Sequence, residues 1–493
     1  MWPPGVRPLT SVESSVAEEN AVALGITLDT LMENAGRTIA EEVAHRVPSP
    51  PAPVAIIAGT GNNGGDGFAA AYYLSQWGYA PQVWIIRPPS EIRSRPARRC
   101  FERVERRGAV RRGIPSASEL SGMAIVVDAL LGTGQTGPLR PPYREAVEAI
   151  RASSAPVLSI DVPSGLGGND GLVPRWTVAL TVPKEGTDAT HAGEVLVRDI
   201  GIPPESWSRT GPGEFVFYRP LSTRRGRSGR IVVIGGGPYA GAPALAAIAA
   251  LRSGAERATV IAPNPAAISI QSFSPNLVVR AIGERVFRPG DASAILSLVH
   301  EANPRAVVTG MGAGREPETV AALAEVIRGL PSDLPIVVDA DALGALPPTV
   351  PSGRTVVATP NAGEYARAFG GVPGALLSDE ATEVREIARQ RGVLLVVKGE
   401  PDVISDGEVL FQNYHHHVAQ TVSGVGDILA GTIASLLAQG LRPVHAARLA
   451  TFWVGDAGIR GAGRRGSGLV ATDLLEELPT ALVAGLDRIA RLL

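Results

Sequence analysis

The chain has 493 residues, a length that at about 100–200 residues per domain predicts two or three folded domains. Its 46 basic and 48 acidic residues leave a formal net charge of −2, so no general basic field favours nucleic acid or an anionic membrane as a partner. With 45% hydrophobic and 19% charged residues, the chain is expected to fold, and small molecules become the favoured ligands.

The first half alternates short runs of apolar, β-branched residues with longer Ala- and Leu-rich segments of helical spacing, a pattern that predicts a parallel α/β sheet. Helices are predicted over Thr27–Val47, Gly65–Trp77 and Pro142–Ala152. Strands are predicted over Val54–Ala58, Val83–Ile86, Ala124–Val127, Val157–Ile160, Val178–Val182 and Glu194–Val197.

The stretch from Glu214 to Ser228 is polar and rich in turn residues, so it is predicted to be a linker between domains over residues 1–218 and 225–493. The second half repeats the α/β pattern, with helices predicted over Ala244–Ser253, Asp427–Ala438 and Pro443–Gly458. Its strands are predicted over Arg230–Ile234, Ala258–Ile261, Ala306–Thr309, Ile336–Val338, Thr355–Ala358 and Leu394–Val397, followed by a hairpin over Val403–Gln412.

Cysteine and lysine are both scarce. The single cysteine, Cys100, excludes an intrachain disulfide and favours a reducing, cytoplasmic setting. The sequence shows no signal peptide and no run of roughly 18 uncharged apolar residues, so no membrane association is expected. Only two of the 46 basic residues are lysines, Lys184 and Lys398, and neither lies in a Walker A motif. Any reaction step that needs a lysine therefore has two candidates.

A glycine-rich corner, residues 59–67 (GTGNNGGDG), lies directly after the first predicted strand and directly before a helix. Such a corner points backbone N–H groups and the positive end of a helix at an anion, which predicts a ligand that carries phosphate. Asn62, Asn63 and Asp66 add polar side chains that a simple turn does not need. The alternative interpretation is a turn whose glycines serve only helix–strand packing.

Two aspartates follow later strands of the same half, Asp128 in DALLGTG and Asp161 in DVPSG. Because ligands bind outside the carboxyl ends of parallel strands, both should face the same crevice as Asn63. Oxygens of Asn63, Asp128 and Ser164 suit a hard cation, and a single carboxylate suits a monovalent ion better than a divalent one. Alternatively, the aspartates only cap the helices that follow. Lys184 ends another predicted strand and either reaches the same crevice or lies in solvent.

These motifs, in this order, resemble the epimerase domain of the NAD(P)H-hydrate repair enzymes (the YjeF N-terminal type) over about residues 10–215. The resemblance implies a Rossmann-like, three-layer αβα domain that epimerises carbon 6 of hydrated NADH or NADPH, with potassium bound by Asn63, Asp128 and Ser164. In our hypothesis, Asp161 moves the proton of the ring hydroxyl or of water, and Lys184 stabilises or relays charge. The residues implied to contact the hydrate are Asn62, Asn63, Gly64, Gly65, Asp66, Gly132, Thr133, Gly134, Gln135, Thr136, Gly137, Pro138 and Asp161.

In the second half, the segment SGVGD (residues 423–427) leads into a long apolar helix. Gly424 and Gly426 let the backbone line an anion hole at the helix N-terminus, and Asp427 is placed to act as a base on a hydroxyl. Alternatively, Asp427 only stabilises the helix dipole. Lys398 follows a predicted strand and is expected to neutralise or orient nucleotide phosphates, unless it lies in solvent.

Another pair of aspartates, Asp339 and Asp341, follows a predicted strand of the second half. Their spacing allows the two side chains to share a face and hold magnesium near a phosphate. The alternative is that they only cap the end of the strand.

The SGVGD segment resembles the GxGD signature of ribokinase-like folds, and the order of motifs over about residues 225–480 resembles the NAD(P)H-hydrate dehydratase domain. The resemblance implies a ribokinase-like αβα domain that dehydrates the S-hydrate with ADP or ATP, of which prokaryotic members commonly use ADP. Residues implied to contact the nucleotide are Lys398, Gly399, Glu400, Pro401, Asp402, Ser423, Gly424, Val425 and Gly426, and those implied to contact the substrate are Ala242, Gly312, Asn361 and Asp427.

The chain departs from the dehydratase pattern at two positions. Asn361 stands where the family has histidine, so any acid/base duty of that histidine is in doubt, whereas a hydrogen-bonding role is retained more easily. Met311 stands where the family has proline, which matters less because the backbone makes the contact.

Taken together, the motifs predict a bifunctional, cytoplasmic repair enzyme of the α/β class, in which an epimerase equilibrates the two hydrates and a dehydratase restores NAD(P)H from one. Asp427 would deprotonate the ring hydroxyl, which attacks the terminal phosphoryl group before phosphate leaves. Potassium, ADP or ATP, and magnesium are the expected cofactors, and the resemblance implies homo-oligomers. The alternatives are a ribokinase-like small-molecule kinase fused to a Rossmann-like ligand-binding domain, or a non-enzymatic interaction module in the first half.

Overall fold

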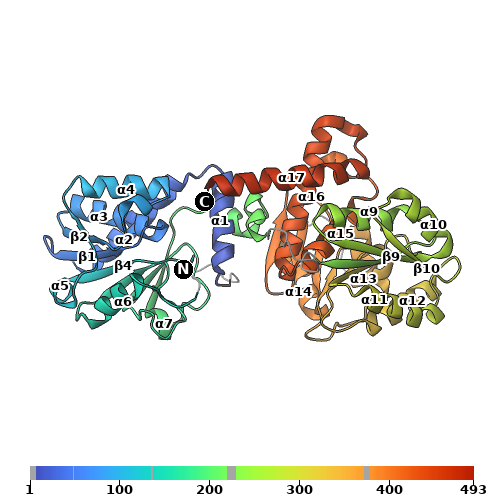
Figure 1. Ribbon diagram of the computed structural model, residues 1–493, viewed down its shortest axis with the longest axis horizontal. Helices are drawn as coiled ribbons and strands as arrows, with labels where there is room; N and C mark the ends of the chain where they lie inside the picture. The colour runs from blue at the N-terminus through green and yellow to red at the C-terminus, as the bar shows by residue number, and fades with distance from the viewer. Residues whose placement is uncertain (1–6, 48, 135–136, 219–228, 371–377, 493) are drawn as a thin grey trace. The chain divides into compact units, whose positions relative to one another are not determined.

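The computed structural model describes residues 7–47, 49–134, 137–218, 229–370 and 378–492. The chain divides into two compact units, one ending at Ser206 and one beginning at Trp207 (Figure 1). This division lies earlier than the domain boundary expected at residue 218, because the 3₁₀ helix η2 (Pro212–Phe217) packs on helices of the second unit. Within the described residues, no helix is both long and apolar enough to span a membrane.

The first unit is a three-layer αβα sandwich around a seven-stranded parallel sheet, in the order β3-β2-β1-β4-β5-β6-β7. Helices α2, α3 and α4 cover one face of the sheet, and α5 and α6 cover the other (Figure 1). The strands are β1 (Pro53–Ala58), β2 (Ala80–Ile85), β3 (Val110–Arg112), β4 (Ile125–Ala129), β5 (Val157–Ile160), β6 (Trp176–Leu180) and β7 (Glu194–Arg198). The helices are α1 (Ser11–Ala23), α2 (Leu28–Arg46), α3 (Asn62–Gln76), α4 (Arg95–Glu105), α5 (Ala117–Ser121), α6 (Tyr143–Ala152) and α7 (Ala189–Ala192), and the short α8 (Glu205–Ser208) spans the division between the units.

The second unit has a nine-stranded sheet in the order β10-β9-β8-β11-β12-β13-β14-β15-β16, parallel as far as β14 and antiparallel beyond it. Its strands are β8 (Arg230–Ile234), β9 (Arg257–Pro263), β10 (Val278–Ile282), β11 (Ala306–Thr309), β12 (Ile336–Val338), β13 (Val356–Ala358), β14 (Leu394–Val397), β15 (Asp402–Ser405) and β16 (Leu410–Asn413). Its α-helices are α9 (Gly241–Arg252), α10 (Asn264–Phe273), α11 (Ala292–Ala302), α12 (Pro317–Gly329), α13 (Ala362–Phe369), α14 (Ser378–Arg391), α15 (Val425–Ala438), α16 (Pro443–Arg465) and α17 (Ala471–Leu492).

Helices lie on both faces of this second sheet as well. The apolar side chains of α11, α12, α13 and α14 form one continuous core with the sheet, whereas α9, α15 and α16 pack on the opposite face (Figure 1). The prediction of an α/β chain with two αβα domains is therefore confirmed.

In each unit the strand order reverses at one place, between β1 and β4 in the first sheet and between β8 and β11 in the second. At such a switch point the loops on either side leave in opposite directions and open a crevice at the carboxyl ends of the strands. The glycine-rich segments of both halves follow these strands directly. Both candidate sites therefore lie where an open α/β sheet usually binds its ligand.

Candidate active sites

The glycines that follow β1 allow α3 to pack tightly on the sheet. A Cβ atom on Gly64 would lie 2.1 Å from the carbonyl oxygen of Gly59, and one on Gly67 would lie 2.6 Å from the Cβ of Ala129. Helix α3 begins at Asn62, earlier than the expected start at Gly65, so the polar side chains of this segment belong to its first turn. The glycines thus serve packing, while the polar side chains and the backbone N–H groups of the first turn remain for a ligand.

Asp128 is fully buried near the end of β4, and protein donors surround its carboxylate. Ser159 Oγ and the Ser164 backbone N–H donate to Oδ2 at 2.8 and 2.9 Å. Ser164 Oγ and the Leu130 backbone N–H donate to Oδ1 at 2.7 and 3.2 Å. Burial raises the pKa of Asp128 above its usual value, although the hydrogen bonds from Ser164, Ser159 and Leu130 oppose the rise.

The three residues expected to bind a cation meet around the backbone of Leu131. Asn63 Nδ2 donates to the Leu131 carbonyl oxygen at 3.0 Å, and the Leu131 N–H donates to Ser164 Oγ at 3.1 Å. No donor in the described part of the chain reaches Asn63 Oδ1, although Asn63 is only 8% exposed. An amide oxygen without a protein donor beside a hydroxyl and a single carboxylate is a set of hard ligands that fits a monovalent cation.

The loop after β4 lies beside this group of side chains. A Cβ atom on Gly132 would lie 3.3 Å from the Cβ of Asn63, so the loop rests directly on the first turn of α3. Thr133 is partly exposed, and Gly134, Gly137 and Pro138 are exposed. Gln135 and Thr136, which were expected to contact the ligand, lie outside the described residues.

Asp161 and Lys184 form an ion pair at the carboxyl ends of β5 and β6. Asp161 has a φ of +64°, a left-handed backbone that is rare for residues other than glycine and that recurs at functional sites. Lys184 Nζ also donates to the Leu180 carbonyl oxygen at 2.9 Å, and the Leu180 N–H donates to Asp161 Oδ1 at 3.2 Å. Lys184 is only 7% exposed, so it does not lie in solvent.

Two further carboxyl groups lie within electrostatic range of this pair, Asp66 in the first turn of α3 and Glu18 in α1. Burial and the charge of Asp161 raise the pKa of Asp66 well above its usual range. Desolvation by the surrounding protein and the charge of Asp161 raise the pKa of Glu18 above its usual value, although its side chain is exposed to solvent. Glu18 lies in none of the sequence motifs, because the helix that carries it has no glycine-rich corner and no preceding strand.

In the second unit, the loops that follow β8 and β11 interlock at the switch point. The Gly236 N–H donates to the Met311 carbonyl oxygen at 2.8 Å, and a Cβ atom on Gly312 would lie 2.5 Å from the Tyr239 carbonyl oxygen. Gly312 has a φ of +65°, which also favours glycine. Met311 thus takes part through its backbone, and Ala242 lies close by in sequence, in the first turn of α9.

Lys398 lies among carboxylates at the end of β14. Its Nζ is 2.9 Å from Asp339 Oδ1 and 3.9 Å from Glu364 Oε2, and a Cβ atom on Gly426 would lie 2.8 Å from the same Nζ. Burial alone would lower the pKa of Lys398, but Asp339 and Glu364 raise it above its usual value. Lys398 is therefore a charged group held against the start of α15 rather than a lysine in solvent.

Asp427 is the third residue of α15. Burial and the nearby charge of Asp339 raise its pKa to about 7, while Lys398 acts in the opposite direction. Gly424 leads into the helix with a left-handed backbone, at a φ of +101°. A Cβ atom at this position would lie 2.6 Å from Leu245 Cδ1, so the position requires glycine. Ser423 and Val425 therefore lie at the N-terminus of α15. Asp427 is half-buried, close to Lys398 and Asp339.

Two further segments expected to bind ligands border this cluster. The turn formed by Gly399, Glu400 and Pro401 joins β14 to β15, and the Gly399 N–H donates to Asp402 Oδ1 at 3.0 Å. Asn361 caps α13, because its Oδ1 accepts from the Glu364 N–H at 2.9 Å. Asparagine is a favoured cap, which accounts locally for the residue that stands in place of the family's histidine.

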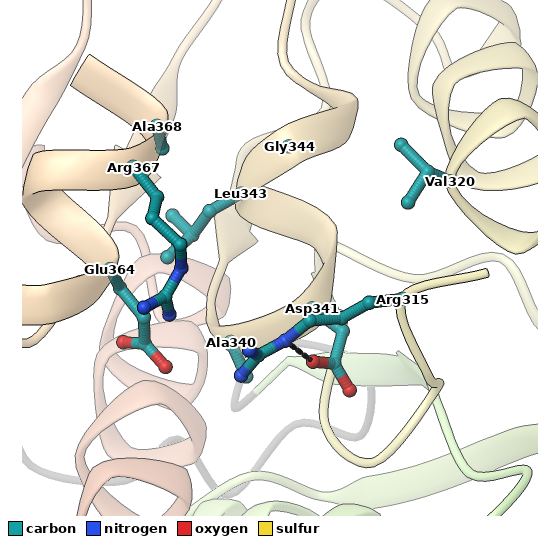
Figure 2. Close-up of a pocket in the computed structure, with 9 residues that line it drawn as sticks. All are labelled: Arg315, Val320, Ala340, Asp341, Leu343, Gly344, Glu364, Arg367 and Ala368. Carbon is teal, nitrogen blue, oxygen red and sulfur yellow. Dashed lines mark hydrogen bonds and ion pairs between the residues drawn. The ribbon is translucent and has the colours of Figure 1, made fainter. Parts of the chain in front are cut away.

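Asp339 and Asp341 do not face one another. Asp341 accepts hydrogen bonds from the Gly314 N–H and from Arg315 Nε, both at 2.9 Å, whereas Asp339 pairs with Lys398. In the described ranges of the chain, no three His, Cys, Asp or Glu side chains gather as a metal site. Figure 2 shows the pocket beside Asp341, which is lined by Arg315, Val320, Ala340, Asp341, Leu343, Gly344, Glu364, Arg367 and Ala368.

Comparisons with known proteins match both units. A family model described as NAD(P)H-hydrate dehydratase matches residues 231–480, and one described as the YjeF-related protein N-terminus matches residues 28–186. Curated relatives named bifunctional NAD(P)H-hydrate repair enzyme Nnr include the protein from Pyrobaculum aerophilum, which is 38% identical over 97% of this chain and 98% of the relative. The Hyperthermus butylicus relative is 36% identical over 97% of this chain and 92% of its own length.

A solved structure of the ADP/ATP-dependent NAD(P)H-hydrate dehydratase from Bacillus subtilis is also similar to the chain. It is 24% identical, with a TM-score of 0.46, and the match covers 55% of this chain and 97% of that one.

Proposed function

The chain belongs to the family of bifunctional NAD(P)H-hydrate repair enzymes, and we propose that its two switch-point sites divide the work between them. The protein epimerises hydrated NADH and NADPH and dehydrates the S form back to the reduced dinucleotide. The observation that carries the division is that each unit has its own partly buried lysine–aspartate pair, Lys184 with Asp161 and Lys398 with Asp339. Family membership favours repair over the small-molecule kinase and the interaction module.

In the first unit we assign epimerisation to the crevice that Asn62–Asp66, the loop after β4 and Asp161 border. Lys184 pairs with Asp161, and we assign this aspartate as the base for the ring hydroxyl or for water. The N–H groups at the start of α3 suit the phosphates of the hydrated dinucleotide. These roles rest on the ion pair and on the position of the helix at the switch point.

The donor set of Asn63, Asp128 and Ser164 supports potassium as the cation of the first unit. Bound potassium would supply a fixed positive charge beside the hydrate. Asn63 Oδ1 is the ligand atom without a protein donor among the described residues, so Asn63 is the residue that would respond most directly to the ion. The carboxylate of Asp128 holds Ser164 in place through two hydrogen bonds.

Potassium is expected to stabilise the first unit selectively. At a potassium concentration of 100 times the dissociation constant, the free energy of unfolding should rise by about 2.7 kcal/mol, because only the folded site binds the ion. Thermal unfolding in potassium and in tetramethylammonium chloride at equal ionic strength measures this difference. The Asn63→Leu variant serves as the control and should lose it; equal melting temperatures of the wild-type protein in both salts would contradict the assignment.

In the second unit we assign dehydration to the site around Asp427. Asp427 removes the proton from the hydroxyl on carbon 6, the oxygen attacks the terminal phosphoryl group, and the shortened nucleotide leaves. Phosphate then leaves carbon 6 as the ring nitrogen donates its electron pair, and loss of a proton from carbon 5 restores the double bond. The closeness of Lys398 to the start of α15 supports its role at the nucleotide phosphates.

We further propose ADP or ATP as co-substrate, with nucleotide contacts from Lys398, the turn after it and the segment before Asp427. Magnesium at nucleotide sites commonly uses one or two carboxylates together with the phosphates. Asp339 and Glu364, beside Lys398, are the carboxylates best placed for that use. A cytoplasmic location rests on the single, buried Cys100, and assembly into homo-oligomers rests on the family resemblance.

Replacement of each lysine by arginine is expected to impair one activity and leave the other intact. Both lysines are held in close, partly buried pairs, and the planar guanidinium group is larger than an ammonium group and directs its donors differently. Lys184→Arg should slow epimerisation alone and Lys398→Arg should slow dehydration alone, each by about ten- to a hundredfold. Separate assays with pure R-hydrate and pure S-hydrate measure the two effects. Wild-type behaviour of both variants would remove the lysines from the mechanism.

A further inference from the structure

A pocket in the second unit adjoins the proposed dehydration site, yet none of its lining residues is among those implied to contact substrate or nucleotide. The pocket is lined by the loop after β11, by the 3₁₀ helix η4 (Ala340–Ala345), and by α12 and α13 (Figure 2). Its volume is about 180 Å³, smaller than the roughly 300–1,000 Å³ of a pocket that holds a whole drug-sized ligand. The pocket therefore fits one part of a dinucleotide and not the whole molecule.

Two segments that line the pocket begin at residues expected to contact the substrate. The loop after β11 runs from Gly312 to Arg315. Helix α13 runs from its cap, Asn361, to Arg367 in its second turn. The Arg367 side chain folds back along this helix, because a Cβ atom on Gly363 would lie 3.5 Å from both Arg367 Nη1 and Asn361 Oδ1. A ligand that lies along Gly312 and Asn361 would therefore come next to both arginines.

The start of η4 connects the pocket to the Lys398 cluster. Asp339 pairs with Lys398 at 2.9 Å. Two residues later, Asp341 lines the pocket and accepts from Arg315 Nε at 2.9 Å. Ala340 between them has a φ of +50°, a left-handed backbone that is rare for residues other than glycine and that recurs at functional sites. The pocket and the Lys398 cluster are therefore neighbours that share one short segment of backbone.

The groups that the pocket offers to a ligand are guanidinium groups. Its two carboxylates already have donors, since Asp341 accepts from the Arg315 side chain and Glu364 accepts from the Asn361 N–H at 2.8 Å. Arg367 has no acceptor among the residues that the structure describes. Both arginines are exposed and reach into the space between α13 and η4, and the other lining residues are small or apolar (Figure 2). Guanidinium groups pair well with phosphate, so a phosphate group is the ligand class that fits.

We propose that this pocket binds a phosphate of the adenosine half of the hydrated dinucleotide, and that Arg315 and Arg367 contact it. With the hydroxyl of carbon 6 at Asp427, the nicotinamide half lies along Gly312 and Asn361, and the adenosine half enters the pocket. The inference rests on the proposed dehydration at Asp427.

Two phosphates of the adenosine half qualify. One belongs to the diphosphate bridge and is present in both hydrates, and the other is the 2′-phosphate, which only hydrated NADPH carries. Either contact lies far from carbon 6 and is made equally in the ground state and in the transition state. Its loss should therefore raise KM and leave kcat nearly unchanged.

The test compares Arg367→Gln and Arg315→Gln with Arg328→Gln, an exposed arginine of α12 that serves as the matched control. We expect each pocket variant to raise KM for the S-hydrate of NADPH by about 10- to 100-fold, because a charge-assisted hydrogen bond is lost. KM for ADP or ATP should stay unchanged. Hydrated reduced nicotinamide mononucleotide, which lacks the adenosine half, should react equally well with the variants and with the wild-type protein.

A rise in KM for hydrated NADPH alone would identify the 2′-phosphate, and an equal rise for hydrated NADH would identify the diphosphate bridge. Wild-type KM values in Arg367→Gln would overturn the inference, and so would an equal rise for the mononucleotide or a rise for ADP or ATP alone. If Arg315→Gln unfolds the unit by leaving Asp341 without its partner, Arg367→Gln decides. Absence of dehydration by the wild-type protein would instead refute the proposed function of the second unit.

Discussion

Asp427→Asn is expected to lower the rate of S-hydrate dehydration by about 10²–10⁴-fold while epimerisation continues at the wild-type rate. Asparagine keeps the size of the side chain but cannot take the proton from the ring hydroxyl. The half-buried position of Asp427 beside Asp339 gives it a pKa of about 7, high enough for an effective base and low enough for ionisation at physiological pH. Recovery of reduced-nicotinamide absorbance from pure S-hydrate and nucleotide measures the effect.

The pH dependence of the same reaction follows from this pKa. Because the base form of Asp427 is required, kcat/KM for dehydration should rise as the pH increases through about 7 and level off above it. Asp333→Asn, an exposed aspartate of the same unit, is the matched control and should keep both the rate and the profile. A rate that falls with increasing pH through this range, or an Asp427→Asn variant with wild-type turnover, would remove Asp427 as the base.

Asp161→Asn should lower epimerisation by about 10²–10⁴-fold and leave dehydration of pure S-hydrate intact. The substitution removes the base and also leaves Lys184 without its carboxylate partner in a buried position. Loss of one partner of a buried pair costs stability, so the first unit should also unfold at lower temperature. The double variant Asp161→Asn/Lys184→Met, which has no unpaired charge, separates the two effects.

The double variant should regain much of the stability and none of the epimerisation. R-hydrate supplied alone, followed by its conversion to the S form, measures the activity, and thermal unfolding measures the stability. Recovery of epimerisation in the double variant would mean that Asp161 acts only by neutralising Lys184. Wild-type epimerisation by Asp161→Asn itself would exclude Asp161 as a proton-transfer group.

The strands that bear the sites were predictable because they are buried apolar runs bordered by glycine and aspartate. All six strands predicted in the first half are present, and β1 and β4 lead into the motifs that meet at Leu131. The edge strand β3 was missed because it has three residues, of which the two arginines are exposed. A strand without an apolar run leaves no periodic signal in the sequence.

Helices proved harder to predict where their buried face is not apolar. Helix α1 buries Glu13, Glu19 and Asn20 together with Val16 and Ala17, so its sequence lacks the apolar stripe that marks an amphipathic helix. For the same reason the backbone pairing between Leu9 and the Lys184 loop, which precedes α1, was not predictable. Contacts between distant segments are set by tertiary structure, and no local spacing encodes them.

The boundary between the units shows the same limit. The turn-rich stretch around residue 220 drew the predicted boundary to residue 218, but η2 belongs with the second unit. Phe215 packs edge-on against Phe452 and Trp453, and Glu214 forms a buried ion pair with Arg448 at 2.8 Å. These aromatic and ionic contacts, made far along the chain, place η2 in the second unit, and composition alone does not reveal them.

The most direct test of the division of labour mixes the purified protein with equal amounts of R- and S-hydrated NADH and either ADP or ATP. The absorbance of reduced nicotinamide is then followed to completion. If the first unit epimerises and the second dehydrates, all of the hydrate should return to NADH with one of the two nucleotides. Recovery that stops at half of the hydrate would contradict epimerisation by the first unit. No recovery while the nucleotide stays intact would contradict dehydration by the second unit.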